Sequence, residues 1–281
     1  MTAVLNPAAV KPGLRTRLMA HPFIQAVLGI VLTFAAVPLT MITVSVLVEK
    51  PYRVVWPQLL AAVLVWFGYR FYVRRIEKRE PVELATRGMG RELGAGLLMG
   101  SALVSVTFAL LWMLGAYRFD GMNPLSGALL LPLAELLLVG LAEELMFRGV
   151  IFGVAHRALG TRWAIVISSA IFALGHLPNE GVSMLAVAAL VAYGVLQAAL
   201  YLNTRRLWVC IGTHIAWNYC VGQVFSSVVS GHASDAGLLR GQFMGDALLT
   251  GGAFGVEGSL VTVLLIACVA AWVLHSRRPR A

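Results

Sequence analysis

Five residues of types that support hydrolysis lie within apolar segments of this chain: Glu143, Glu144, His176, His214 and Asn218. A charged side chain at the centre of a membrane helix costs about 2.5 to 3.5 kcal/mol on insertion scales, so acids in such segments are functional candidates. A carboxylate can act as a general base on water, and histidine or asparagine N–H groups can stabilise an oxyanion. The set therefore suits hydrolysis by an activated water molecule.

Spacing separates the two neighbouring glutamates. Glu144 and Arg148 are four residues apart, so they share one helical face and are predicted to pair. Glu143 is rotated by about 100° from Glu144 and is not tied to that arginine by spacing. We interpret the pair as supporting structure and Glu143 as the catalytic acid. Glu135, two turns away, is interpreted as an accessory or packing residue.

The histidines come from two further segments, FALGH and HIAWN, which place Phe172 with His176 and His214 with Asn218 on one face each. Glu143 and His176 are each fourteen residues from the basic turn at 157–162, or about 21 Å along a helix. By the same rise, Asn218 lies about 18 Å and His214 about 12 Å from the basic pair at 205–206. The four side chains are predicted to converge in one layer, against the simpler alternative of separate helix-packing hydrogen bonds.

Composition defines the surroundings of these residues. Of the 281 residues, 59% are hydrophobic and 12% are charged, well below the charged fraction of soluble domains. The net charge of +9 sits in short segments between apolar runs and forms no basic face, so a nucleic-acid partner is not expected. Cys210, Cys220 and Cys268 lie in apolar runs without metal-site or disulfide spacing, and we interpret them as small buried residues.

The pattern of apolar runs predicts an all-α, polytopic membrane helix bundle of about eight transmembrane helices. We divide the chain into an N-terminal cytoplasmic tail (1–22), two spans with a basic loop (23–92), a catalytic helix bundle (93–227), and an external loop, last span and cytoplasmic tail (228–281). The expected spans are 23–48, 54–69, 93–117, about 125–157, 163–177, 183–203, 207–227 and 258–274.

Basic residues give the orientation, because cytoplasmic loops collect Lys and Arg. With eight spans and a cytoplasmic N-terminus, eighteen of the 22 basic residues face the cytoplasm. These are Lys11, Arg15, Arg17, the seven between 70 and 91, Arg148, Arg157, Arg162, Arg205, Arg206, Arg277, Arg278 and Arg280. Both termini are therefore predicted to be cytoplasmic, in what is expected to be a bacterial inner membrane.

Three motifs in this order, EELMFRG (143–149), F-x-x-x-H (172–176) and H-x-x-x-N (214–218), resemble those of the CAAX prenyl endopeptidase and bacteriocin-processing family of intramembrane proteases, abbreviated CPBP or Abi. The resemblance covers about residues 125–222. It implies peptide hydrolysis inside the membrane by attack of water, with no covalent enzyme intermediate. The expected partners are the lipid bilayer and a peptide or membrane-protein substrate.

In that interpretation Glu143 is the general base, His176 orients the water, and His214 and Asn218 bind the oxyanion, with Glu144, Arg148 and Phe172 in support. No cofactor is favoured. The alternative is a metalloprotease in which Glu143, His176 and His214 bind a divalent metal such as Zn²⁺. A different class also stays open: a non-catalytic membrane regulator or immunity protein, or a transporter with an intramembrane proton relay.

Overall fold

The structure is a computed structural model that describes residues 18–234 and 237–276. Over these residues the protein is mostly helical, with one small two-stranded sheet, which confirms the expected helical membrane bundle. Residues 1–17 of the predicted N-terminal tail, and the basic residues at 277, 278 and 280, lie outside the described ranges.

Helices occupy each of the eight predicted spans. Among the described residues three are long and apolar enough to cross a membrane, Pro22–Leu47, Met89–Met113 and Met184–Thr204, and two more are shorter apolar helices. The count of eight crossings stays a prediction. In chain order the helices are α2 (Pro22–Phe34), α3 (Ala36–Leu47), α4 (Trp56–Arg75), α5 (Met89–Met113), α6 (Leu133–Glu144), α7 (Gly153–Leu159), α8 (Thr161–Gly175), α9 (Met184–Thr204), α10 (Trp208–Tyr219), α11 (Ala247–Thr250) and α12 (Leu260–His275).

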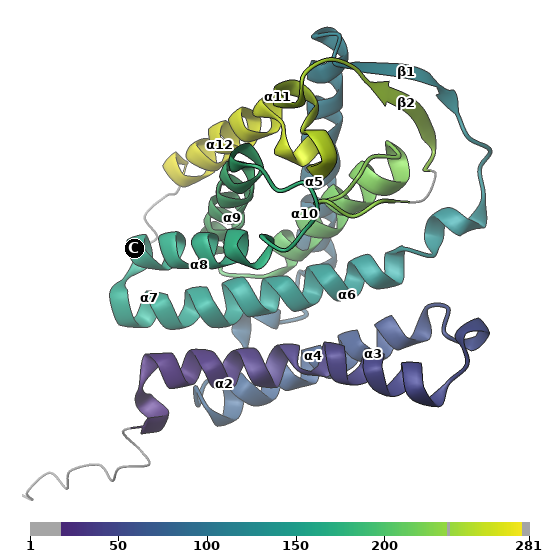
Figure 1. Ribbon diagram of the computed structural model, residues 1–281. Helices are drawn as coiled ribbons and strands as arrows, with labels where there is room; N and C mark the ends of the chain where they lie inside the picture. The colour runs from purple at the N-terminus through teal and green to yellow at the C-terminus, as the bar shows by residue number, and fades with distance from the viewer. Residues whose placement is uncertain (1–17, 235–236, 277–281) are drawn as a thin grey trace, which may run out of the picture.

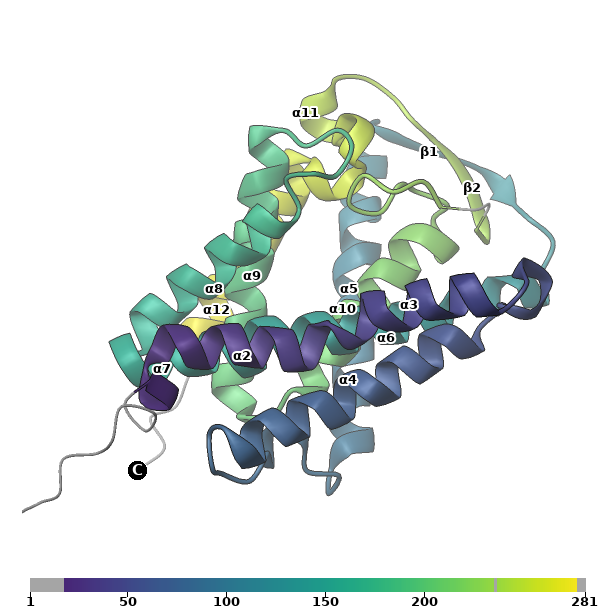
Figure 2. The same ribbon diagram turned by 60° about the horizontal axis from the view of Figure 1, so that its bottom comes forward.

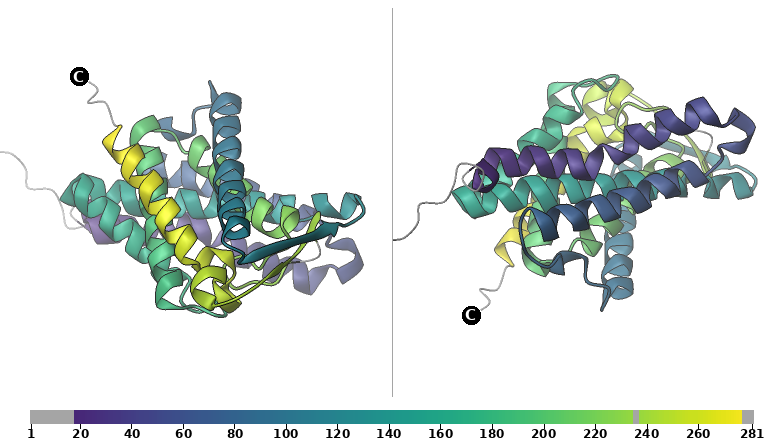
Figure 3. Two further views of the ribbon diagram at one scale, coloured as in Figure 1. Left: turned by 90° about the horizontal axis from the view of Figure 1, so that it is seen from above. Right: turned by 90° about the horizontal axis from the view of Figure 1, so that it is seen from below.

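The helices form two groups (Figure 1). The α2–α3 pair and α4 lie alongside α6 and α7 and cover one side of the molecule, as the turned view and the view from below also show (Figures 2 and 3). The remaining long helices, α5, α8, α9, α10 and α12, pack on the other side of α6 and α7, with α5 against α10 and α9 against both α8 and α12. The long α6–α7 segment therefore lies between two groups of helices.

A proline bends the first span. Pro38 has no N–H group for the carbonyl of Phe34, four residues earlier, and its ring clashes with that carbonyl. The helix accordingly breaks into α2 and α3 at Ala35. The bend lies where the Phe34 side chain reaches the central cavity described below.

Glycines bring α5 and α10 into close contact. A Cβ atom at Gly96 would lie 2.3 Å from the carbonyl oxygen of Val209, and one at Gly100 would lie 2.4 Å from that of Thr213. Gly96 and Gly100 are four residues apart on one face, the small-residue spacing that lets membrane helices approach. This contact fixes α10, which carries two of the predicted site residues.

Two of the three helices that carry site residues, α6 and α10, continue as π-helix just after those residues. α6 passes into a π-helical segment at Leu145–Phe152, and α10 passes into another at Cys220–Val224. Such wide turns occur frequently at functional sites.

The depth estimate assumed that the helix runs without a break from Glu143 to the basic turn at 157–162. The helix indeed continues past Gly149 and through α7 to Leu159. Gly149 faces Tyr69, whose ring would lie 2.6 Å from a Cβ atom there.

Two short strands, which were not predicted, join the segments expected on the external side. β1 (Tyr117–Met122) pairs antiparallel with β2 (Leu239–Phe243), with Tyr117 opposite Phe243. Figure 3 shows the sheet beside one end of α5. The segments expected in the cytoplasm also lie together: Arg157 pairs with Glu77, and Arg206 lies 3.3 Å from Glu92. These contacts agree with the predicted alternation of loops.

Candidate active site

A cavity of about 540 Å³ lies at the centre of the bundle and is lined by all four residues predicted to converge. Glu143 comes from the end of α6, His176 follows the last residue of α8, and His214 and Asn218 stand one turn apart on α10. Glu135 also contributes to the wall. Residues from three separate helices thus line one cavity, as their predicted depths along the helices indicated.

Glu143 is the acid that faces this cavity. Its side chain is 21% exposed, and its Oε2 atom lies 3.9 Å from Nε2 of His214. Oε2 is itself buried and forms no hydrogen bond with any described residue. The carboxylate thus borders the cavity with one oxygen that has no hydrogen-bond partner among the described residues.

Glu144 points the other way and is completely buried. Its Oε1 atom lies 3.2 Å from Nη1 of Arg148, which confirms the pairing predicted from the four-residue spacing. The guanidinium, also completely buried, donates a second hydrogen bond of 3.3 Å to the carbonyl oxygen of Gly194 and lies 5.0 Å from the ring centre of Phe172. This pair ties α6 to α8 and α9.

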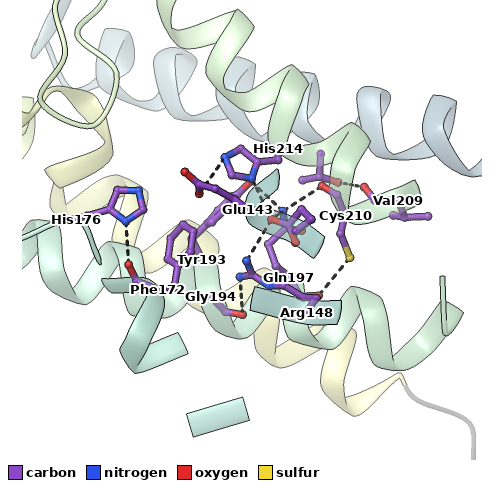
Figure 4. Close-up of polar contacts among 12 residues, drawn as sticks. Glu143, Arg148, Phe172, His176, Tyr193, Gly194, Gln197, Val209, Cys210 and His214 are labelled. Carbon is purple, nitrogen blue, oxygen red and sulfur yellow. Dashed lines mark hydrogen bonds and ion pairs between the residues drawn. The ribbon is translucent and has the colours of Figure 1, made fainter. Parts of the chain in front are cut away.

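The same carboxylate orients His214. Nδ1 of His214 lies 2.9 Å from Oε1 of Glu144, and because a carboxylate accepts, the ring nitrogen donates. Nε2 of that ring is then left to face Glu143 and the cavity (Figure 4). Spacing alone had suggested a purely structural Glu144, whereas the structure connects it directly to a predicted site residue.

Gln197 completes the buried network and was not predicted from the sequence. Its Nε2 atom lies 3.1 Å from each of three acceptors: Oε1 of Glu144, the hydroxyl of Tyr193 and the carbonyl oxygen of Cys210. Tyr193 also contacts the imidazole of His214 edge-on at 5.8 Å. A signal was present, because a glutamine in an otherwise apolar span is itself a functional candidate.

His176 lies across the cavity from this network. Its Nδ1 atom donates to the carbonyl oxygen of Phe172 at 2.8 Å, so Nε2 carries the free lone pair in the neutral ring. The ring also packs on the buried Phe172 side chain at 4.6 Å between centres. Figure 4 shows this contact apart from the His214 group, with the Glu143 side chain between them. His176 is therefore oriented to accept a hydrogen bond within the cavity.

Asn218 is half-buried and lines the cavity one turn after His214. Its side-chain amide makes no hydrogen bond with another residue in the described part of the chain, so its N–H group is available to a bound molecule. The neighbouring Trp217 is bound elsewhere: its indole donates a 2.7 Å hydrogen bond to Glu257. Glu257, which also lines the cavity, was missed because its segment carries no motif.

The cysteine interpretation needs one correction. Cys210 and Cys220 are buried, but Cys268 is exposed. It lies on the outer face of α12, where an apolar run does not imply burial because lipid is itself apolar. Cys210 donates a weak hydrogen bond to the carbonyl oxygen of Gln197 at 3.4 Å.

The alternative metal site would use Glu143, His176 and His214 as ligands. Across residues 18–234 and 237–276, no group of three or more His, Cys, Asp or Glu side chains is arranged to hold a metal ion. Nδ1 of His214 and Nδ1 of His176 both donate to protein oxygens, so each ring has its Nε2 atom left for the cavity. Glu143, His176 and His214 are not such a group in this conformation, although all three line the cavity.

The fold and the cavity together define a membrane helix bundle with an acid–histidine site between its helices. Residues 125–220 match the family model described as Type II CAAX prenyl endopeptidase Rce1-like, which agrees with the resemblance drawn from the three motifs. The matched segment contains Glu143, His176, His214 and Asn218, and supports a CAAX-type intramembrane protease in general. No curated protein matches the chain.

Proposed function

We propose that the protein is an intramembrane endopeptidase that hydrolyses peptide bonds of a membrane-associated or secreted-peptide substrate. The observation that carries this proposal is the position of Glu143. Its carboxylate has an unpaired oxygen in a cavity that it shares with His176, His214 and Asn218. A membrane protein in the bacterial inner membrane, with both termini cytoplasmic, is the setting we propose for this activity.

In the proposed reaction, Glu143 takes a proton from a water molecule that also donates a hydrogen bond to Nε2 of His176. The hydroxide formed attacks the carbonyl carbon of the scissile peptide bond and gives a tetrahedral oxyanion. The carbon–nitrogen bond then breaks, and the proton held by Glu143 passes to the departing amine. One carboxylate thus serves first as base and then as acid, which is a usual role for a positioned glutamate.

The oxyanion would be stabilised from α10. Asn218 donates through its amide N–H, and His214 donates through Nε2, two interactions of the kind that favour a tetrahedral intermediate. Because Nδ1 of His214 already donates to Glu144, donation from Nε2 requires both ring nitrogens to carry hydrogen. The imidazolium would then lie between the carboxylates of Glu143 and Glu144, which favour its positive charge.

The proposed scheme uses no metal, because the Glu143 carboxylate can itself take the proton from water. The glutamic mechanism predicts that activity survives treatment of the purified protein with a strong chelator and subsequent desalting. Metal analysis of the same sample provides the control for removal. Loss of activity on chelation, with recovery on adding Zn²⁺, would contradict the glutamic mechanism.

The proposed function is tested by comparing the membrane peptidome of cells that contain the wild-type protein with cells that contain Glu143→Gln. The variant keeps the shape of the side chain and removes its basic carboxylate. We expect a defined set of peptides to fall by 10²- to 10⁴-fold, the effect usual for losing a general base.

Glu49→Gln is the matched control, because Glu49 is exposed and lies outside the cavity. It should leave the same peptides unchanged. Identical peptidomes for wild type and Glu143→Gln, at equal protein levels, would overturn the proposal in favour of a non-catalytic regulator, an immunity protein or a transporter.

A further inference from the structure

One wall of the cavity comes from a part of the chain that follows the matched family segment. It includes the stretch 228–232, which we call the cap segment, and the short helical turn Val256–Gly258. Val229, Ser230, His232 and Glu257 all line the cavity. The proposed reaction does not use any of them.

Glu257 is the buried acid in this wall, with a relative exposure of 8%. Its two carboxylate oxygens have different partners. Oε1 accepts a 2.7 Å hydrogen bond from the indole of Trp217 on α10. Oε2 accepts from both the hydroxyl group, at 2.9 Å, and the backbone N–H of Ser230. One side chain thus connects the cap segment to the helix that carries Asn218.

The backbone of the cap segment is shaped around this acid. Ser230 adopts a left-handed conformation with φ of 47°, which is uncommon for a residue with a side chain. That conformation directs both its N–H and its hydroxyl at Glu257. Gly231 follows with φ of 82° and lies so close to the carbonyl oxygen of Glu180 that a Cβ atom would be 2.3 Å away.

Two further hydrogen bonds join the backbone of the cap segment to neighbouring segments, and Val229 packs against the hydrophobic core. Asn179, next to the end of α8, donates to the carbonyl oxygen of Ser230 at 2.9 Å, and Gly231 donates to that of Phe254 at 2.9 Å. Among the described residues Glu257 is the one acid that hydrogen-bonds the cap segment, and it has no ion-pair partner there. His176 lies near enough to favour the charge of this carboxylate but makes no ion pair with it, so the three hydrogen bonds from Trp217 and Ser230 hold the acid and its donors together.

We propose that Glu257 is a positioning residue that completes the active site from outside the matched segment. Oε2 holds the cap segment against the cavity, and Oε1 fixes Trp217 and thereby the turn of α10 that presents Asn218. The role of Oε2 in holding the cap segment stands on the contacts alone, whereas the role of Oε1 in placing Asn218 rests on the proposed proteolytic function. The two parts therefore call for separate measurements.

Hydrogen–deuterium exchange of the purified protein tests the first part without any substrate. In Glu257→Gln the new amide nitrogen cannot accept from Ser230, so amides in a peptide covering 226–234 should exchange at least tenfold faster. Peptides from α9 should keep their wild-type rate, which excludes general unfolding, and Glu49→Gln should change neither. Equal exchange of the 226–234 peptide in Glu257→Gln and wild type would overturn the cap role.

Kinetics on a synthetic peptide that spans a cleavage site found in the peptidome comparison test the second part. Trp217→Phe removes only the indole donor, and should lower kcat at least tenfold with KM within twofold, because Asn218 loses its placement. Ser230→Ala removes only the hydroxyl donor and should raise KM with kcat within twofold. Unchanged kcat in Trp217→Phe would overturn the role of Glu257 in placing Asn218.

A double variant shows whether the indole acts through Glu257. Trp217→Phe added to Glu257→Ala should lower kcat by less than a further twofold, since Glu257→Ala already removes the oxygen that accepts from the indole. Full additivity of the two effects would overturn the proposed connection. Should no cleavage site be found, the proteolytic function fails while the exchange result still decides the role of the cap segment.

Discussion

Nδ1 of His214 lies 2.9 Å from Oε1 of Glu144, while Nε2 of the same ring faces Oε2 of Glu143 at 3.9 Å. Two adjacent glutamates at the end of α6 therefore meet opposite nitrogens of one imidazole from α10. This is possible because neighbouring helical residues point about 100° apart, so one acid turns inward and the other faces the cavity. The buried acid sets the orientation of the ring, and the cavity acid remains available for chemistry.

The contact between Glu144 and His214 predicts that Glu144→Gln lowers activity although this side chain does not face the cavity. Glutamine can accept from Nδ1, but it no longer carries the charge that favours a doubly protonated ring. We expect kcat to fall about 10- to 100-fold, the range for residues that orient functional histidines in metal sites. Nitrogen-15 NMR of labelled histidines, assigned by comparison with His214→Gln, should show the altered protonation of this ring.

The outcome that would contradict this role is a Glu144→Gln protein with normal kcat and an unchanged His214 signal. Glu135→Gln serves as the control, because Glu135 lines the same cavity but is exposed and makes no hydrogen bond with the described residues. Its kcat should remain close to the wild-type value.

The arrangement of loops predicts the membrane topology. Arg157 with Glu77, and Arg206 with Glu92, join three loops on one side, whereas β1 and β2 join two segments on the other. Reporter fusions at Glu80 and Arg278 should therefore read cytoplasmic, and a fusion at Ser234 should read external. A cytoplasmic signal at Ser234 would contradict the eight-span topology.

Local spacing predicted those parts of the site that lie along one helix or on two helices joined by a short turn. The pair of Glu144 and Arg148, and the shared depth of Glu143 and His176, follow from helical geometry and the basic turn between two neighbouring helices. The hydrogen bond from Gln197 to Glu144 joins residues 53 positions apart. Its formation depends on how α6 and α9 pack, which single-helix spacing does not determine.

The same limit applies to the external segments. Pairing between β1 and β2 spans more than 100 residues, and Leu239 to Phe243 alone reads as an ordinary polar and apolar mixture. The role of Glu257 likewise depends on Trp217 and Ser230 reaching it from two other segments. The π-helical turns after Glu144 and Tyr219 were not predicted either, because their sequences resemble those of regular helix.

Burial predicts a pH dependence for Glu257. Desolvation raises the pKa of this carboxyl above its ordinary value, against the opposing effects of the hydrogen bonds from Trp217 and Ser230 and of the nearby His176. A group with a higher pKa in the folded state binds protons more readily when folded, so the free energy of unfolding rises as pH falls through that pKa towards the unfolded value near about 4.3. Glu257→Gln cannot titrate and lacks this contribution.

The expected result is that the melting temperature of the wild type, minus that of Glu257→Gln, increases as pH is lowered from about 7 to about 4.5. Detergent-solubilised proteins and a thermal melt at each pH suffice for the measurement. A difference that shrinks over this interval would show that the ionised carboxylate is the form favoured by the fold.

The last prediction separates the architecture of the site from its chemistry. Arg148→Ala strands the charge of Glu144 in a fully buried position, where only Gln197 and His214 remain as partners. Breaking a buried pair in this way commonly costs about 3 to 5 kcal/mol. The variant should therefore show a lower yield, a lower melting temperature and lost activity, whereas Glu143→Gln should lose activity alone.

Replacing both partners tests whether the stranded charge is the cause. The double variant Glu144→Gln, Arg148→Met leaves no unpaired charge, so part of the lost stability should return while activity stays low. Melts in detergent and cleavage assays on the four proteins decide the matter. Full stability of Arg148→Ala would mean that the guanidinium is not needed to balance Glu144, and that the hydrogen bonds from His214 and Gln197 suffice to hold that carboxylate inside the bundle.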